Sequence, residues 1–389
     1  MKNILFLFIA LITLLLSFAT ISCKGQMEQE TASPILDNLD YFAKIDSMEY
    51  ATDYLLKNNH LYILGYSFED SYAIKSILSC INIQSKELKW SKTFNDYQTT
   101  KFTKMSSYDN AIYITGSVGE TGRLNENTTE EFWDLYPAAI KVDFNGNVLH
   151  TGKTNKVDSY GIVSRLIKCK GTYFMAYITM TVDNSSKSYE VDMIELSEKL
   201  ETRKIKNIHN QFLNSLDLIE FGDHFYLMGK GHQDLPYLYK ITEYLFVEKV
   251  NTDALIKNNI HKITEFICYK DSKKLNFVGM DKDINPRARN TVYMFSYDGS
   301  NFDIQSSYTF PDSIKWSRHL TTVTNNGFFS LTYDGTETEL LKISKKSVDG
   351  LGKFTKEREL KFALNPEDTK NAIYIFDKGN KIFLGASTN

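Results

Sequence analysis

The longest irregular stretch of the chain, residues 117–137, carries aromatic rings among carboxylates. Its most concentrated cluster consists of Phe132, Trp133, Asp134 and Tyr136. Aromatic faces beside carboxylates suit stacking on a sugar ring or cradling of a peptide. The competing interpretation is that these rings pin the loop onto its own structural unit, since compact loops pack by their own side chains.

Arg287 and Arg289 form a second candidate site, because two guanidinium groups close together suit an anion. A pair of solvated surface charges is the alternative. Asp281, Asp283 and Asn285 have the spacing that opens a calcium loop, but Pro286 and Val292 stand where that loop needs Gly and Glu. We therefore predict no metal site.

Local catalytic motifs are missing from the sequence. It contains no Gly-x-Ser-x-Gly, no His-Glu-x-x-His and no phosphate-binding glycine motif, and we predict no cofactor. A site assembled from several distant segments would leave no such motif, so an enzyme stays open as an alternative. The 45 basic and 48 acidic residues give a net charge of −3, which argues against a nucleic-acid partner.

These candidates belong to a chain in which one short phrase recurs seven times. Each copy is a β-rich run that follows a turn and usually ends in a small residue, as in residues 59–65 and 110–116. The closing positions are Gly65, Gly116, Ala176, Gly229, Gly279, Thr332 and Gly385. Their spacing of 50 to 60 residues, with several strands per unit, is typical of a β-propeller.

Each repeat predicts four antiparallel strands. One strand precedes the phrase, the phrase is the second, and a third and an outer strand follow, with turns such as Asn145-Gly146 between them. We thus predict an all-β, seven-bladed propeller, with six blades and a separate end unit as the alternative.

The last repeat lacks its outer strands, because the chain stops at Asn389 soon after the closing Gly385. Residues 39–44 have strand character and no partner of their own. We expect this N-terminal strand to join the last blade and to close the ring. A last blade of only three strands is left open.

The connection after the phrase varies in length between repeats, whereas the turn before it stays short. All variable loops must leave one face of the ring, and that face is the predicted binding surface. Trp316 and Arg318 enter the innermost strand of the sixth unit and are predicted to line the axis, with core packing as the alternative for Trp316.

The N-terminus resembles a secretory signal: Lys2, a short apolar run and then small residues before Cys23. An uncleaved membrane anchor is the alternative. Residues 21–23 resemble a bacterial lipoprotein box, although Thr20 stands where that box usually has Leu. The resemblance implies a signal peptide over residues 1–22, a lipidated Cys23 and a polar tether over residues 23–35.

A single propeller domain would then span residues 36–389. The lipid-anchor resemblance implies a location at the bacterial outer membrane or cell surface, with a membrane as partner. The periplasmic side of the outer membrane is an alternative location. The remaining cysteines, Cys80, Cys169 and Cys268, are expected to be buried free thiols.

One outer segment, residues 85–90, resembles the blade ending of quinoprotein-type propellers, through Trp90 alone. More broadly, the seven repeats are similar to bacterial propeller lipoproteins. Our leading hypothesis is a lipid-anchored module that binds a glycan, a peptide or an envelope protein. The alternative is a propeller-type polysaccharide lyase or glycoside hydrolase.

Overall fold

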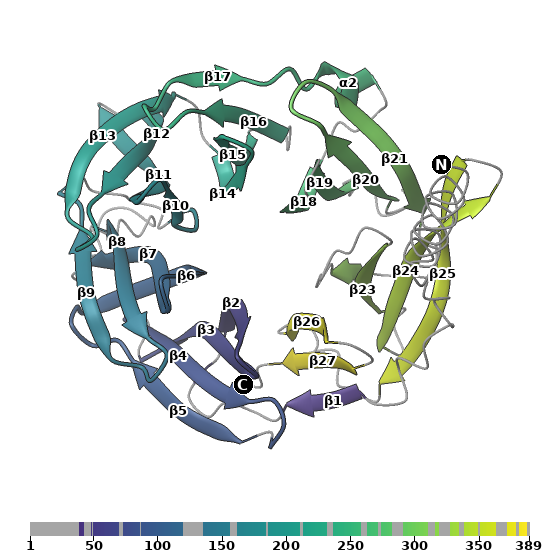
Figure 1. The fold of residues 1–389 in the computed structure, drawn as a ribbon, viewed down its shortest axis with the longest axis horizontal. Helices are drawn as coiled ribbons and strands as arrows, with labels where there is room; N and C mark the ends of the chain where they lie inside the picture. The colour runs from purple at the N-terminus through teal and green to yellow at the C-terminus, as the bar shows by residue number, and fades with distance from the viewer. Residues whose placement is uncertain are drawn as a thin grey trace, which may run out of the picture.

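We describe the protein from a computed structural model of the chain. The structure describes residues 39–42, 48, 50–69, 73–85, 87–119, 135–155, 162–183, 186–210, 213–231, 236–257, 263–270, 274–281, 291–309, 316–318, 327–333, 338–348, 351–362, 372–378 and 381–386. Within these residues the strands form seven sheets, arranged around a common axis (Figure 1). The chain is a β-propeller, as predicted.

Six sheets have four antiparallel strands each, ordered from the axis outward as they occur along the chain. The first three are β2 (Tyr50–Lys57), β3 (His60–Phe68), β4 (Ile74–Asn82) and β5 (Leu88–Thr93); β6 (Thr99–Tyr108), β7 (Ala111–Gly119), β8 (Leu135–Asp143) and β9 (Val148–Lys153); and β10 (Ile167–Cys169), β11 (Thr172–Asp183), β12 (Ser186–Leu196) and β13 (Thr202–His209).

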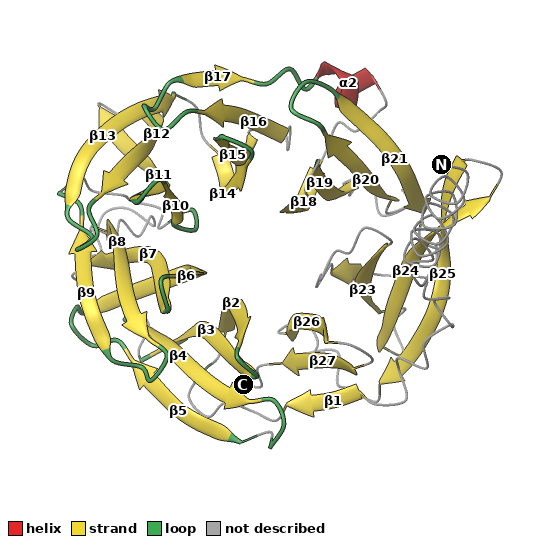
Figure 2. Cartoon of the chain, viewed as in Figure 1, coloured by secondary structure: helices red, strands yellow, loops and turns green. Residues whose placement is uncertain are grey.

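The next three are β14 (Leu213–Phe221), β15 (His224–Gly231), β16 (Pro236–Ile241) and β17 (Val247–Lys249); β18 (Ile263–Lys270), β19 (Leu275–Asp281), β20 (Thr291–Tyr297) and β21 (Phe302–Thr309); and β22 (Trp316–Arg318), β23 (Gly327–Tyr333), β24 (Thr338–Val348) and β25 (Leu351–Phe362). The recurring phrase is the second strand of each sheet, as predicted. Strands make up nearly all of the ring, and α2 (Asp253–Lys257) is a short helix at its periphery (Figure 2).

The seventh sheet joins the two ends of the chain. It contains β1 (Leu39–Phe42), β27 (Lys381–Ala386) and β26 (Ala372–Lys378), in that order. The predicted closing strand is therefore confirmed, and the sheet has three strands. It departs from the antiparallel prediction in one respect: β1 runs parallel to β27, with Leu39 opposite Ile382 and Phe42 opposite Gly385.

The predicted turns between the first and second strands have the expected conformation. Asn58, Asn59, Asp109 and Asn110 have φ between 49° and 61°, which Asn and Asp tolerate best among residues with a side chain. We call the face of the ring that carries these turns, and those at 170–171 and 222–223, the turn face. The opposite face, where second strands pass to third strands, is the loop face.

The third sheet differs from the sequence prediction in two ways. Its connection after the phrase is mostly strand: β11 and β12 pair from Tyr173 with Leu196 to Asp183 with Ser186, leaving two residues between the strands. Its innermost strand is shorter than the strand that the sequence predicts over residues 164–169: β10 begins only at Ile167, and Val163 makes an isolated bridge to Tyr177.

The hydrophobic core lies between neighbouring sheets. Phe174 of the third sheet stacks on Phe225 of the fourth, with ring centroids 4.9 Å apart, and both side chains are buried. Other buried clusters join the first sheet to the second and the fourth to the fifth. The second, third and fourth sheets thus bury both faces against their neighbours. Of the helices in the described residues, none is long and apolar enough to cross a bilayer.

The cysteines match the prediction in part. Cys80 is a buried free thiol, as expected. Cys169 is also free but only half-buried, because it ends the short strand β10 beside the turn at 170–171. The side chain of Cys268 lies outside the described residues.

Candidate functional site

One position on the inner strands carries a charged residue in four successive sheets. Asp53 on β2 pairs with Leu64, Lys104 on β6 with Thr115, and Asp217 on β14 with Met228. Each partner directly precedes the closing glycine of its phrase. In the third sheet, Arg165 takes the matching place, because Ser164 donates its N–H to the carbonyl of the closing residue Ala176 at 2.8 Å.

A β-bulge helps to place these residues. The pairing register shifts between Phe102 and Lys104, so the inner strand bends toward the closing Gly116. A Cβ at position 116 would lie 2.2 Å from the Lys101 carbonyl oxygen. The small residue that ends this phrase is therefore required by the close approach of the bulged inner strand.

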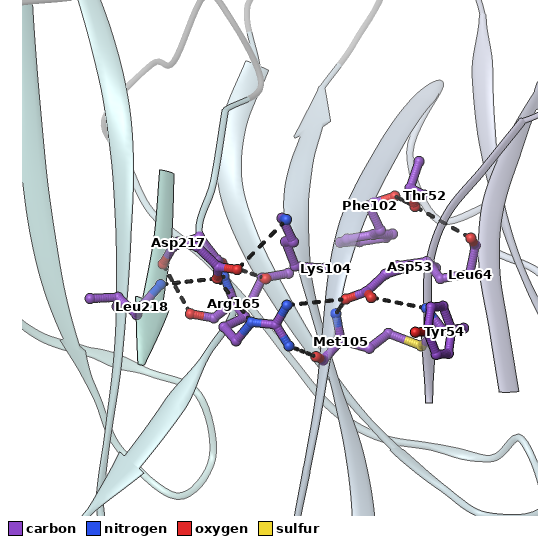
Figure 3. Close-up of polar contacts among 12 residues, drawn as sticks. Thr52, Asp53, Tyr54, Leu64, Phe102, Lys104, Met105, Arg165, Asp217 and Leu218 are labelled. Carbon is purple, nitrogen blue, oxygen red and sulfur yellow. Dashed lines mark hydrogen bonds and ion pairs between the residues drawn. The ribbon is translucent and has the colours of Figure 1, made fainter. Parts of the chain in front are cut away.

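Arg165 is the centre of the resulting network (Figure 3). Its Nε donates to Asp217 Oδ1 at 2.9 Å, and its Nη1 donates to the Met105 carbonyl at 3.3 Å. Its Nη2 lies 4.0 Å from Asp53 Oδ2. This one side chain thus reaches from the third sheet to the fourth, the second and the first.

Both carboxylates are also held by backbone N–H groups. Asp53 accepts from Met105 N at 2.7 Å and from Tyr54 N at 2.9 Å. Asp217 accepts from Leu218 N at 2.9 Å, and its Oδ2 lies 3.8 Å from the Lys104 ammonium. Two anions and two cations leave the network without net charge.

Electrostatics keep Asp217 and Arg165 ionised. Burial alone would raise the pKa of Asp217, but the charges of Arg165 and Lys104 and the hydrogen bonds to Asp217 outweigh it and hold the pKa below its usual range. The charge of Asp217, together with that of Asp53, raises the pKa of Arg165 despite burial. Water reaches this network of four charged residues, since the side chains of Asp53 and Arg165 are 15% and 36% exposed.

The network is therefore suited to clamping sheets together and poorly suited to proton transfer. A general acid or base works best when its pKa lies near the operating pH, and Asp217 is shifted the wrong way for that task. In the part of the chain that the structure describes, no group of three or more His, Cys, Asp or Glu residues is arranged to hold a metal.

Most of the predicted site residues cannot be compared with this geometry. Outside the described residues lie Cys23, Phe132, Trp133, Asp134, Arg287 and Arg289. Trp316 and Arg318 are on β22, the innermost strand of its sheet, opposite Tyr333 and Leu331. Leu331 directly precedes the closing Thr332, so Arg318 has the same register position as Asp53, Lys104 and Asp217.

Tyr136 is half-buried and lies on β8, so the prediction of an irregular stretch over residues 117–137 was wrong at its ends, which pair as β7 and β8. The Lys153 ammonium lies 5.1 Å from the centroid of its ring and 5.3 Å from that of Tyr97. Lys153 ends β9 and is exposed, and Tyr97 belongs to the connection between β5 and β6. These three residues, the Tyr97–Lys153–Tyr136 cluster, lie on the loop face beside the end of the longest loop.

Sequence reasoning missed Asp53, Lys104, Arg165 and Asp217, although a signal was present. A charged residue stands 12 positions before Gly65, Gly116 and Gly229, and 11 before Ala176. Aligning the repeats on their closing residues would have brought Asp53, Lys104 and Asp217 into one column and Arg165 into the column beside it.

Comparisons with known proteins place the fold and no more. No protein-family model matches the chain, and no curated protein matches it. Among solved structures, a polysaccharide lyase described as a PL25 ulvan lyase superposes with a TM-score of 0.50 at 12% identity, covering 83% of this chain and 87% of the lyase.

Two further solved structures are more distant. Hydrazine synthase of Kuenenia stuttgartiensis has a TM-score of 0.44 at 8% identity, covering 77% of this chain and 78% of that chain. A Trypanosoma rangeli sialidase has a TM-score of 0.42 at 8% identity, covering 84% of this chain and 58% of the sialidase. At these identities the likeness concerns the fold alone.

Proposed function

We propose that this protein is a lipid-anchored module of the bacterial cell envelope that binds a ligand on the loop face of its propeller. The ligand class that we favour is an anionic glycan; a peptide or an envelope protein would use the same surface. Cys23 would carry the anchor, and the segment between β7 and β8 would supply Phe132, Trp133 and Asp134 to the site.

The observation that carries this proposal is the Tyr97–Lys153–Tyr136 cluster. An exposed ammonium between two half-buried aromatic rings offers a positive charge for an acidic sugar and flat apolar surface for its ring. Neither tyrosine is fully buried, so a ligand could contact the cluster on the face where the variable loops leave the ring.

The axis supports binding over catalysis. Among the described residues, the axial carboxylates Asp53 and Asp217 are occupied by backbone N–H groups and by Arg165. A catalytic acid would need a free, protonated carboxyl near neutral pH, and the pKa of Asp217 is lowered instead.

The binding test is a glycan and peptide array probed with the soluble chain from Thr31 onward. We expect uronate-containing glycans to bind, and Lys153→Ala to weaken their binding about tenfold, equivalent to about 1.4 kcal/mol. Trp133→Ala tests the contribution of the long loop in the same assay.

Lys249→Ala is the matched control, because Lys249 lies over the Tyr237 ring at 4.9 Å in another sheet. Equal effects of the two lysine substitutions, or binding that ignores Lys153 altogether, would contradict this site. The anchor is tested separately: Cys23→Ala should release the protein from membranes, and retention would contradict lipidation.

A polysaccharide lyase or glycoside hydrolase is the second candidate. It is supported by the two partly exposed cations of the axis, Lys104 and Arg165, which an acidic substrate would contact, whereas the acid or base would have to come from elsewhere in the chain. The superposed ulvan lyase makes anionic polysaccharides the first substrates to try. Incubation should be followed by ultraviolet absorbance for unsaturated products and by assays for new reducing ends; absence of both across acidic polysaccharides would reject this candidate.

A further inference from the structure

Large apolar side chains are exposed mainly along one rim of the ring. Among the described residues, six large hydrophobic side chains are strongly exposed, and four of them lie in or beside the hairpins that join third and outer strands: Leu88, Leu149, Tyr244 and Phe246. Third strands run from the loop face to the turn face, so these hairpins lie on the turn face. We call these four residues the turn-face rim.

The hairpin between β16 and β17 presents its aromatic rings rigidly. Thr242 N donates to the Phe246 carbonyl at 3.0 Å, and Leu245, with φ of 63°, donates back to the Thr242 carbonyl at 2.9 Å. Leu245 is fully buried, whereas Tyr244 and Phe246 on either side are 69% and 68% exposed. The turn is anchored in the core by one residue while its neighbours face water.

Two ion pairs lie beside the rim. The Lys170 ammonium lies 2.7 Å from Glu243, and Lys89 lies 3.4 Å from Glu87. Lys206 donates to the Leu245 carbonyl at 2.5 Å and lies 5.5 Å from the Phe246 ring. The rim thus combines exposed apolar side chains with ion pairs, and the attraction that it offers to a surface is mainly apolar.

The N-terminal strand enters the ring from this same face. β27 begins at Lys381, which pairs with Lys378 at the turn end of its hairpin, and β1 runs parallel to it with Leu39 opposite Ile382. Leu39 is therefore the turn-face end of β1. Only 16 positions separate it from Cys23, a reach of about 55 Å if fully extended.

We infer that the turn-face rim docks on the lipid bilayer, so that the loop face points away from the membrane. Tyr and other aromatic side chains favour the region between headgroups and acyl chains, and a lipid anchor that leaves from the same face holds the rim close to it. The inference rests on the proposed lipidation of Cys23, which supplies the membrane, and adds the orientation of the ring.

The test compares two tryptophan probes in the full lipidated chain, reconstituted in vesicles that contain brominated lipids. Phe246→Trp probes the rim, and Phe68→Trp is the matched control, because Phe68 is 44% exposed at the loop-face end of β3. We expect the emission added at position 246 to lose most of its intensity and the emission added at 68 to be unaffected. Equal quenching at both positions, or none at 246, would overturn the inference.

The dependence of quenching on lipid charge and on salt tests whether the docking is apolar. Since the exposed side chains of the rim are apolar, most of the quenching at 246 should persist on zwitterionic vesicles and at high ionic strength. A requirement for anionic lipid would overturn apolar docking. A protein partner or a second copy on the rim would leave position 246 unquenched by lipid.

A second arm separates this inference from the lipid anchor. The chain from Lys24 onward, which retains every described strand, is tethered by an N-terminal histidine tag to nickel-chelating lipids. If Cys23→Ala stays with membranes, lipidation is contradicted, but the tethered protein still decides docking. If lipidation holds and neither arm shows quenching at 246, the docking inference alone fails.

Discussion

At the axis of the ring, Arg165 and Asp217 are charged groups that satisfy each other, whereas at the turn-face rim Tyr244 and Phe246 are apolar rings that face water. The usual distribution of polar and apolar side chains is thus inverted between these two regions. The difference teaches that charge at the axis is used for cohesion within the molecule, while apolar surface at the rim is left for a contact outside it.

Removing the charge of Arg165 at the axis should have the largest effect on stability. Arg165→Met leaves Asp53 and Asp217 without their shared partner, and we expect the free energy of unfolding to fall by roughly 2–4 kcal/mol, below the full cost for a buried pair because the arginine is partly exposed. Denaturant titration measures it. Arg203→Met, at an exposed position of β13, is the control, and an equal loss in both variants would show that the network does not hold the sheets together.

The bulge that shapes the axis can be tested at Gly116. Gly116→Ala forces a Cβ against the Lys101 carbonyl and should cost roughly 1–3 kcal/mol of stability, as overpacking does. The third sheet provides the control, because Ala176 closes its phrase and donates its own N–H to Ser164 Oγ at 2.8 Å. A smaller loss is expected for Ala176→Gly; a Gly116→Ala variant as stable as the parent protein would contradict the close approach.

Acid should weaken the axis in a defined direction. The pKa of Asp217 is lowered in the folded protein, so its contribution to stability is present above the unfolded pKa of about 3.9 and is lost as pH falls through the lower folded value. Stability measured from neutral pH downward should therefore decline below about pH 4, and Asp217→Asn should flatten that decline. A variant with an unchanged acid profile would assign the decline to other carboxylates.

The smallest effect on stability is expected at the rim. Tyr244→Ser and Phe246→Ser remove side chains that are already mostly exposed, so the free energy of unfolding should change by no more than about 0.5 kcal/mol. Thermal or denaturant unfolding in the absence of lipid measures this change. A large loss would mean that the rings stabilise the hairpin itself, and the contrast with the axis would disappear.

The fold was readable from the sequence because its signals are local and repeated. The phrase copies placed the second strands, the short turns before them placed the hairpins, and the incomplete last repeat pointed to residues 39–44, where β1 lies. The parallel direction of β1 was not readable, since it depends on pairing with β27 at the far end of the chain.

The site was less readable because its contacts cross repeats. The backbone N–H of Arg165 lies 3.4 Å from Oδ1 of Asp217, a residue 52 positions away in another sheet. No local sequence pattern indicates that contact. Tyr136 was singled out by its neighbours in sequence, but its partner Lys153 comes from the following strand and from no recognised motif. Likewise, the exposure of Tyr244 and Phe246 depends on Leu245 turning inward.

The pairing of β1 with β27 also sets an order of events. These two strands are separated by nearly the whole chain, so β1 is made first and gains its partner last. Contacts between such distant segments form slowly, because a long loop must close before they form. We therefore expect a late step in refolding, seen as a slow phase that brings residues near Leu39 and Ile382 together, during which the earlier sheets are already formed but the ring is still open.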